Sequence, residues 1–441
     1  MNYSDKDIQI LSTQEILAFI NEHSYDLHKN LDPFLNRIGD ARIVLLGDGS
    51  HGTHEYYIWC ARIIRRLIEE KGFTIIGVVG DWPDCYQVNR YVRHYENIAK
   101  TALDVIINFQ KWPSWIWGNW EMIAFIEWLK NFNHGKDYHQ QVGFYGLDAF
   151  CLWESLDFIK TYLRKNYTNA VVAGNNILQW FESFNRKIDN NTSCFRFDPE
   201  SFENEVVELL KILRRETPSY STDPESPFNI KQNALTTINA ERYFRAMIGG
   251  GINLFNKRDE HMTDTLERLL DFHGPQSKAI IWEQNIHIAD KNHTDIKEES
   301  LLNLRQLTRE KWGVTNTVSV GFGSYKGTVM ASDEWGGAMK KMVVPEASKN
   351  SWEYILHQSS ATDKLIITKD IETHPALRIP LNHRTIGVTY KPEMDFHSNY
   401  LPGLVSKRYD AYIYLDKIHA LHPVITKNNS QQKPESYPWS I

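Results

Sequence analysis

Short apolar segments recur along the chain at long intervals, and most intervals between them carry a helical pattern. Residues 56–71 show such a pattern: Ile, Leu and Arg recur at helical spacing, and Gly72 marks its end. The strand candidates are 42–46, 74–79, 142–145, 278–282, 317–321, 385–389 and 411–415. Strands that alternate with helices favour an α/β fold, with a mostly parallel central sheet and helices on both faces.

The interval between the third and fourth strand candidates contains no convincing strand and reads as several helices, with a polar loop at 217–226. We therefore expect residues 1–150 to form the first part of an α/β core and residues 151–275 a helical insertion. Residues 276–425 would complete the core, and residues 426–441 would form a loosely packed tail.

Charge and cysteine content argue against several classes of protein. The chain has 441 residues, with 49 basic and 55 acidic side chains and a formal net charge of −6, which is atypical of nucleic-acid-binding proteins. Its four cysteines form no CxxC pair, so we expect neither a disulfide framework nor a structural zinc site, and we expect a reducing compartment. The N-terminus is polar and no apolar run approaches 18 residues, roughly the length of a membrane span. These features predict a cytoplasmic protein with a small-molecule substrate and with no nucleic-acid or membrane partner; the oligomeric state is left open.

Residues 43–55 are the most distinctive segment, because a buried-strand pattern ends there in a glycine and a polar turn. Asp48 and His51 follow that glycine, and a helical pattern begins after them. Ligands in open α/β folds bind just beyond the carboxyl ends of such strands. A histidine suits general-base catalysis, and a nearby carboxylate can fix its tautomer. In the structural alternative, Asp48 or Ser50 only caps the helix.

Polar side chains also follow the strand candidate 74–79. Asp81, next to Trp82, could bind or orient a ligand, or it could cap a helix that has a proline near its start. On the predicted insertion, Arg258 and His261 lead into a helix and could reach the same cleft. In the alternative, Arg258 and Asp259 belong to a local ion-pair network.

Glu283, Gln284 and His287 follow the fourth strand candidate. A lone histidine at such a place is often a satisfied core residue, but a second histidine at a second strand end favours a functional pair. His51 and His287 would then act as base and acid on opposite sides of a substrate. With Asp48 they could also form a two-histidine, one-carboxylate metal site. Because no HExxH signature is present, we expect no metal and no cofactor.

Three tryptophans lie within the six residues 112–117, which is too dense for an ordinary helix face. Trp115 and Trp117 could line a cleft for a bulky apolar substrate. They could equally pin a loop to the core, since aromatic side chains bury large areas.

These residues together make the chain resemble the erythromycin esterase family, from about Arg42 to about Pro423. The turn 46–55 is similar to the family motif GE-x-x-HG-x-x-E, and residues 80–92 carry the pattern GDWPD…VNRYV. Further similar segments follow in the same order: 143–148, 152–155, 239–241, Arg258-Asp259, His261-Met262, Asn285 with His287, 320–323 and 386–388.

The resemblance implies an α/β core with a helical insertion and a deep cleft between them. It also implies a metal-independent hydrolase in which His51 activates water and His287 is a second cleft histidine. Some family members hydrolyse the lactone ester of macrolide antibiotics, which links the family to antibiotic resistance and to secondary metabolites.

The chain departs from the family pattern at five cleft positions. Asp48 is a shorter acid where the family has Glu. The family's Arg, Glu, Arg and His are replaced, in that order, by Cys60, Val79, Gly118 and Gln284. Glu283 adds a carboxylate that could partly replace the charge lost at Val79. Because catalytic groups act together, such losses can abolish most of an activity.

We therefore carry three hypotheses for the function. In the first, the protein hydrolyses an ester or lactone of a bulky small molecule, with His51 as base, Asp48 orienting it and His287 stabilising the oxyanion. In the second, the chain is a divergent member recruited to another tailoring reaction in natural-product biosynthesis, such as lactonisation or dehydration. In the third, it is a catalytically silent binding protein.

Overall fold

The computed structural model describes residues 12–95, 99–151, 154–155, 157–159, 161–162, 223–249, 253–290, 302–425 and 433–439. Within these residues a nine-stranded sheet runs in the order β1-β8-β11-β6-β2-β5-β3-β4, and β7 pairs with β6 outside this path. Its strands are β1 (Ser24–Asp26), β2 (Ile43–Leu46), β3 (Ile75–Asp81), β4 (Gly143–Asp148), β5 (Ala279–Trp282), β6 (Thr317–Ala331), β7 (Lys340–Val344), β8 (Lys364–Ile366) and β11 (Ala411–Ile418). A separate pair joins β9 (Leu381–Arg384) to β10 (Tyr400–Gly403).

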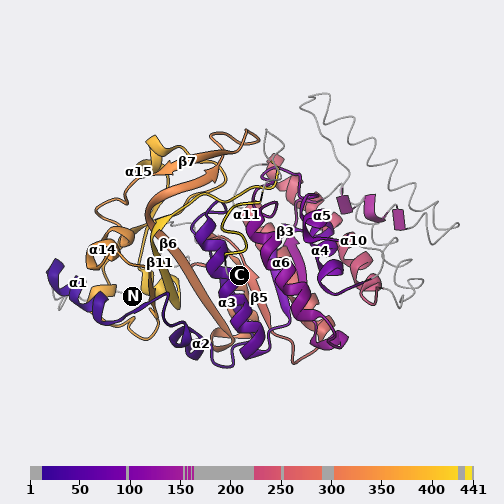
Figure 1. Ribbon diagram of the computed structural model, residues 1–441, viewed down its shortest axis with the longest axis horizontal. Coiled ribbons are helices and arrows are strands. Elements are labelled where there is room, and N and C mark those ends of the chain that lie inside the picture. Colours follow the sequence, from indigo (N-terminus) through magenta and orange to yellow (C-terminus); the bar gives the residue numbers. More distant parts are fainter. Residues whose placement is uncertain are drawn as a thin grey trace.

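Helices accompany the sheet along its whole length (Figure 1). The longer ones are α1 (Thr13–Glu22), α2 (Asp32–Ile38), α3 (His54–Lys71), α4 (Trp82–Val92), α6 (Trp120–Asn133), α10 (Ser226–Gly249), α11 (Asn253–His273), α13 (Leu304–Trp312) and α14 (Trp352–Ser359). The short ones are α5 (Ala102–Ile106), α12 (Asn285–Ile288), α15 (Asp395–Ser398) and α16 (Val405–Arg408).

The central strands β11, β6, β2, β5, β3 and β4 run parallel to one another, whereas at one edge β8 pairs antiparallel with both β11 and β1. Parallel strands need long crossover connections, which the intervening helices supply. The predicted α/β fold, with a mostly parallel sheet, is therefore confirmed.

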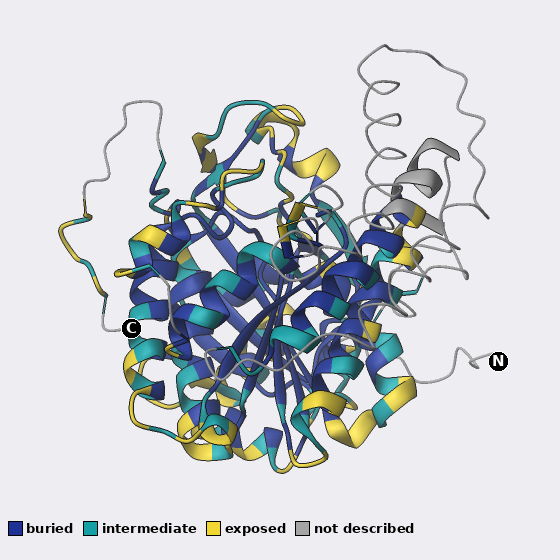
Figure 2. Cartoon of the chain, turned by 90° about the vertical axis from the view of Figure 1, so that its right-hand side faces the viewer, coloured by how far each residue is buried: buried dark blue, intermediate teal, exposed yellow. Residues whose placement is uncertain are grey.

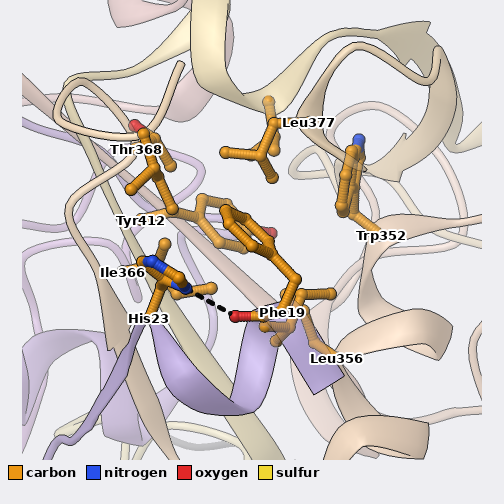
Figure 3. A pocket seen from close by; sticks show the side chains of 11 residues that line it. Phe19, His23, Trp352, Leu356, Ile366, Thr368, Leu377 and Tyr412 are labelled. Atoms are coloured by element: carbon orange, nitrogen blue, oxygen red, sulfur yellow. Dashed lines mark hydrogen bonds between the residues drawn. The ribbon is translucent and has the colours of Figure 1, made fainter. Parts of the chain in front are cut away.

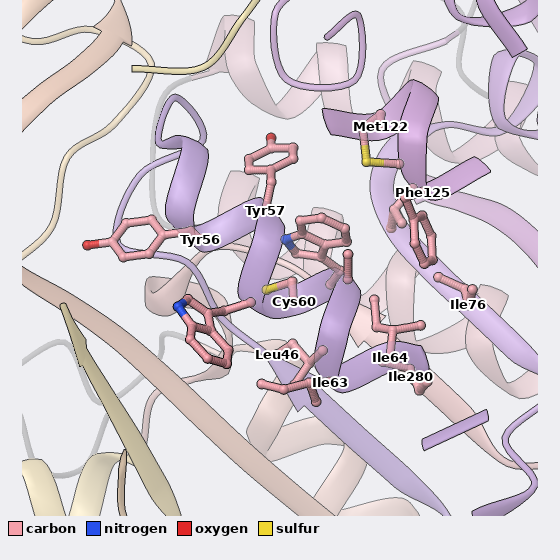
Figure 4. Packing of buried hydrophobic residues seen from close by; sticks show 14 of the residues in the cluster. Leu46, Tyr56, Tyr57, Cys60, Ile63, Ile64, Ile76, Met122, Phe125 and Ile280 are labelled. Atoms are coloured by element: carbon pink, nitrogen blue, oxygen red, sulfur yellow. The ribbon is translucent and has the colours of Figure 1, made fainter. Parts of the chain in front are cut away.

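The strands are buried on both faces because their side chains alternate between two hydrophobic clusters. In β2, Val44 and Leu46 belong to the cluster shared with α3 and α6, whereas Ile43 and Leu45 belong to the cluster shared with α11. Figure 4 shows Leu46, Ile76 and Ile280 of three adjacent strands meeting side chains of α3 and α6. Buried residues fill the centre of the molecule and exposed ones lie on the outer helix faces (Figure 2). Both faces are thus covered, as a parallel sheet requires.

One predicted strand, at 385–389, is wrong. This segment has no strand conformation and instead follows β9 as an extended loop. Its Ile386 N–H donates to Gly49 O at 2.9 Å, and its Ile386 carbonyl accepts from the Gln284 side chain at 2.9 Å. The apolar residues that resembled a strand therefore hold a loop against the carboxyl edge of the sheet.

The predicted helical insertion can be followed only in part, since residues 163–222 lie outside the described residues. Its described C-terminal portion is helical and contains α10 and α11. The division into core, insertion and tail stays a prediction. In the described part of the chain, no helix combines the length and the apolar character that crossing a membrane would require.

Candidate active site

The polar residues singled out in the sequence meet because the carboxyl ends of neighbouring strands are level. Leu46 of β2 pairs with Trp282 of β5, and Val78 of β3 pairs with the same residue. At the end of β3, Asp81 pairs with Asp148 of β4. The turns after β2, β5, β3 and β4 therefore lie side by side at one edge of the sheet, where α/β folds bind their ligands.

The turn after β2 places His51 against Asp48. His51 Nδ1 lies 2.9 Å from Asp48 Oδ2, and Asp48 is fully buried. A β-carbon at Gly52 would lie 1.8 Å from Met330 O, so the close packing of this turn on β6 requires glycine there. Helix α3 starts after Thr53 without a side-chain capping bond, so Asp48 is not a helix cap. The turn instead presents an oriented imidazole.

A second oriented histidine comes from the turn after β5. His287 Nδ1 lies 2.8 Å from Asp259 Oδ1 of α11, and the opposite nitrogen, Nε2, lies 3.1 Å from Nη1 of Arg258. A guanidinium only donates, so Nε2 accepts and the ring proton is on Nδ1, facing Asp259. This contact fixes the tautomer of neutral His287.

Arg258 ties the helical segment to the sheet. Its Nε and Nη2 donate to the two carboxylate oxygens of Asp148 at 3.0 Å and 2.8 Å, the paired geometry that guanidinium and carboxylate favour. Burial opposes the charge of each partner, but their mutual attraction is stronger: the pKa of Asp148 lies below its usual value and that of Arg258 above. Arg258 therefore belongs to an ion-pair network, as the structural alternative expected, but its partner Asp148 is 110 positions away in the chain.

Glu283 lies among these groups with its carboxylate buried. Neither carboxylate oxygen has a hydrogen-bond partner among the described residues, and the closest ion-pair contact is 3.6 Å, between Oε1 and His287 Nε2. Burial raises the pKa of Glu283, and the charges of His287, Arg258 and His51 offset this only in part. A buried carboxylate without a hydrogen bond is costly, and groups perturbed in this way cluster at functional sites.

Neighbouring carboxylates, Glu283 among them, also shift the pKa values of His51 and His287. Burial would lower the pKa of His51, but the charge and hydrogen bond of Asp48, together with Glu283, outweigh burial and raise it. Burial likewise opposes the protonation of His287, and Asp259 with Glu283 outweighs it, so this pKa is also raised. Both rings are therefore more basic than a free histidine.

Asp81 lies at the end of β3 but makes a different contact. Asp81 occupies the N-cap position of α4, but its side chain makes no capping bond; its Oδ2 instead accepts from Lys111 Nζ at 2.9 Å. Lys111 also contacts Glu154 at 2.5 Å. Burial raises the pKa of Asp81 to about 7, and Lys111 offsets part of this effect. Asp81 is thus poised to exchange a proton near neutral pH.

The three tryptophans proposed for substrate binding are buried. Trp82 donates from Nε1 to Asn229 Oδ1 of α10 at 2.8 Å, and Trp117 donates to Val79 O at 2.7 Å. Trp115 is 2% exposed, and its Nε1 has no partner among the described residues. Trp82 and Trp117 hold a helix and a loop in place, and a role in lining a cleft stays a prediction.

His261 and Gln284 also have internal contacts. His261 is buried on α11, with Nδ1 2.9 Å from Asn239 Nδ2, and burial, aided by the charge of Arg268, lowers its pKa to about 3. Gln284 donates to the loop carbonyl of Ile386. Neither contact tests a substrate-binding role, which stays a prediction for both.

Four of the five departures from the family pattern, at Cys60, Val79, Gly118 and Gln284, leave no charged group at their positions. Cys60 is fully buried with its Sγ 3.8 Å from Gly47 O, and burial raises the pKa of this thiol. At Gly118, a β-carbon would lie 2.6 Å from Ser114 O, so the loop has no room for a side chain there. The site therefore relies on Asp48, His51 and the groups of β5 and α11.

Sequence reasoning missed two members of the site, Asp148 and Asp259. Asp148 directly follows an apolar run, a signal that could have found it, whereas Asp259 lies on a helix and its role depends on packing. Asp148 holds Arg258, and Asp259 orients His287.

An enclosed pocket lies elsewhere, between α1, α14 and β11. Its lining is mainly apolar, including Phe19, Trp352 and Leu377, and His23 makes a hydrogen bond to the Phe19 carbonyl (Figure 3). It holds about 10 Å³ of free space, roughly the room for one water molecule. This pocket is part of the core packing and includes none of the strand-end residues.

The erythromycin esterase family profile matches residues 68–418. A putative hydrolase of Bacillus subtilis, YbfO, is 20% identical over 401 residues, covering 86% of this chain and 84% of the relative. Among solved structures, a succinoglycan biosynthesis protein superposes with a TM-score of 0.74 at 20% identity, covering 93% of this chain and 98% of its own. A mutant of the erythromycin esterase EreC in its open conformation superposes with a TM-score of 0.62 at 14% identity, covering 90% of this chain and 95% of its own. The two solved structures show a shared fold.

Proposed function

Because the chain belongs to the erythromycin esterase family, we propose that it is a hydrolase that acts on an ester or lactone of a bulky small molecule. The observation that carries this proposal is the Asp48–His51 pair at the end of β2. Asp48 holds the proton of neutral His51 on Nδ1, which leaves Nε2 free to take a proton from water. The cytoplasm is the compartment we propose, since Cys60, Cys85 and Cys151 are free thiols.

The reaction can be written with the groups present. His51 Nε2 accepts a proton as the oxygen of water bonds to the carbonyl carbon, and the carbonyl oxygen becomes an oxyanion. Arg258 supplies a positive charge that can stabilise it, and neutral His287, whose Nε2 accepts from Arg258, helps to hold that guanidinium in place. The protonated His51 then gives its proton to the alkoxide that leaves as the C–O bond breaks. Glu283 favours the protonated form of His51 by charge attraction.

The test is turnover of a panel of aryl esters and macrolide lactones by the purified chain. The variant His51→Ala is expected to lose at least about 1,000-fold in kcat/KM while keeping its melting temperature within a few degrees. The control is His397→Ala, a change at an exposed histidine outside the site, which should keep full activity. If His51→Ala turned over substrate like the parent, His51 would not be the base.

A second candidate function is favoured by the buried and uncharged positions Cys60 and Val79. With these charges absent, the same pair of histidines could catalyse a non-hydrolytic tailoring step, such as ring closure of a hydroxy ester. Reaction in ¹⁸O-labelled water separates the two functions. Label in the carboxylate product supports hydrolysis, whereas conversion of a hydroxy ester to an unlabelled lactone supports ring closure.

A further inference from the structure

A second histidine–carboxylate cluster lies beside the site but shares no side chain with it. His54 Nδ1 and His422 Nδ1 lie 2.6 Å and 2.7 Å from the same oxygen, Oε1 of Glu121. The three atoms that could bind an ion lie within 4.8 Å of one another. The Glu121 side chain is fully buried, whereas the His422 side chain is 39% exposed. The cluster therefore has an anionic, enclosed base and an opening to solvent.

Backbone hydrogen bonds position these three side chains independently of their own contacts. His54 N donates to His419 O at 2.8 Å, and Trp120 N donates to His422 O at 2.9 Å. The C-terminal segment 419–424 is thereby held against the starts of both α3 and α6. The aromatic ring of Trp439 stacks on His422 and meets the edge of His54, with ring centres 5.2 Å and 4.8 Å apart. The cluster is thus preorganised by elements distant in sequence.

Two imidazoles and one carboxylate are a ligand set that suits zinc and similar transition ions, whereas magnesium and calcium prefer all-oxygen sites. With bonds of about 2.1 Å, tetrahedral ligand atoms stand about 3.4 Å apart. Each nitrogen would therefore move about 0.7 Å away from Oε1 as an ion displaces the two Nδ1 protons, a small adjustment for side-chain torsions. Water from the exposed side of His422 can complete the coordination.

We propose that His54, Glu121 and His422 form a binding site for one divalent transition-metal ion of the zinc type. The ion would clamp the C-terminal segment to the helix that starts three residues after His51. The site is structural in character, since none of its ligands belongs to the Asp48–His51 pair. It does not depend on the proposed hydrolase activity.

The experiment uses the full chain after treatment with a chelator, titrated with Zn²⁺ by calorimetry, with the bound metal counted by elemental analysis. We expect one Zn²⁺ per chain and a higher melting temperature in its presence, because an ion that binds only the folded state stabilises it. His422→Gln should weaken binding at least tenfold and remove the shift in melting temperature. Co²⁺ as a spectroscopic probe should give visible absorption bands in the parent and not in this variant, and Mg²⁺ should give no shift in either.

The matched control is His357→Gln. His357 is also partly exposed and also pairs with a carboxylate, Asp416, at 2.7 Å, but it lies outside the cluster. It should bind Zn²⁺ like the parent. His54→Gln provides an independent test if His422→Gln fails to fold when its circular dichroism is checked without metal. A parent chain that binds no Zn²⁺, or a folded ligand variant that binds it as tightly as the parent, would overturn the proposal.

Discussion

At the residue scale, the site uses one arrangement twice. His51 and His287 each place Nδ1 against a carboxylate, so each offers Nε2 toward the strand ends. They differ in what faces Nε2: that of neutral His287 accepts from Arg258 and so has no N–H to offer a substrate. We therefore expect His51 to act as the base and Arg258, held by His287, to stabilise negative charge.

The raised pKa of His51 predicts the pH dependence of the reaction. A base must be unprotonated, so kcat/KM of the free enzyme should fall as the pH drops through a pKa above the ordinary value of about 6.5. Asp48→Asn removes the charge that raises this pKa, so the acid limb should move to lower pH and kcat should fall by roughly 100-fold or more. The measurement is a pH–rate profile of both proteins on one ester. An acid limb that stayed in place would show that another group titrates.

At the element scale, the tryptophan-rich loop before α6 explains why the chain departs from its family at Gly118. The loop backbone turns so tightly that Ser114 O lies 2.6 Å from the position of a β-carbon at Gly118. Hydrogen bonds from Gly118 N to Ser114 O and from Asn119 to the Trp115 and Ile116 carbonyls keep this turn closed. Restoring the family's arginine would therefore disturb the loop before it could supply a charge.

Gly118→Ala is accordingly expected to destabilise the fold by about 1–3 kcal/mol, because the backbone contact must open to admit one methyl group. Gly387→Ala is the matched control: its β-carbon would meet nothing closer than 3.8 Å, and its φ is not positive. Urea unfolding followed by tryptophan fluorescence measures both. Equal stabilities for the two variants would contradict the steric argument.

The segment 385–389 is predicted as a strand from its apolar residues, but it is a loop. Its apolar pattern is typical of a strand, but its backbone groups bond to Gly49 and to Ser332 rather than to a strand partner in the sheet. A pattern of apolar residues indicates burial, and burial here comes from packing against the turn that carries Asp48 and His51.

At the scale of the whole molecule, the free energy of unfolding should depend on pH through two buried groups: a histidine whose pKa is lowered and an aspartate whose pKa is raised. Burial lowers the pKa of His261 to about 3, so below pH 6.5 the unfolded chain binds a proton that the folded chain does not, and stability is lost as the pH falls. Burial raises the pKa of Asp81 to about 7, so between pH 4 and 7 the folded chain holds a proton that the unfolded chain does not, and stability is lost as the pH rises. The two contributions oppose each other in the parent.

Variants separate these contributions. Between pH 8 and pH 5, the free energy of unfolding of His261→Gln should improve relative to the parent by about 2 kcal/mol, and that of Asp81→Asn should worsen by about 2–3 kcal/mol. Urea unfolding at both pH values gives the differences, and the values at pH 8 serve as the reference for each substitution. Shifts of the same sign in both variants would contradict the assignment.

The sequence by itself determined the fold class and the edge of the sheet at which the site lies. Apolar periodicity and the residues that end each strand are local properties, and they placed Asp48, His51, Glu283 and His287 at strand ends that the structure then set level with one another. Six of the seven predicted strands are present in the structure, because the apolar pattern that predicts a strand is also a local property.

Only the tertiary structure decided which charge pairs with which. Arg258 meets Asp148, His287 meets Asp259, and Glu121 meets both His54 and His422, across separations of up to 301 positions along the chain. These partners come from different helices, strands and loops whose packing brings them within 3 Å, and no local pattern encodes that distance. Local sequence patterns therefore identify the candidate reactive side chains, whereas long-range packing sets the hydrogen bonds and charges that determine their protonation.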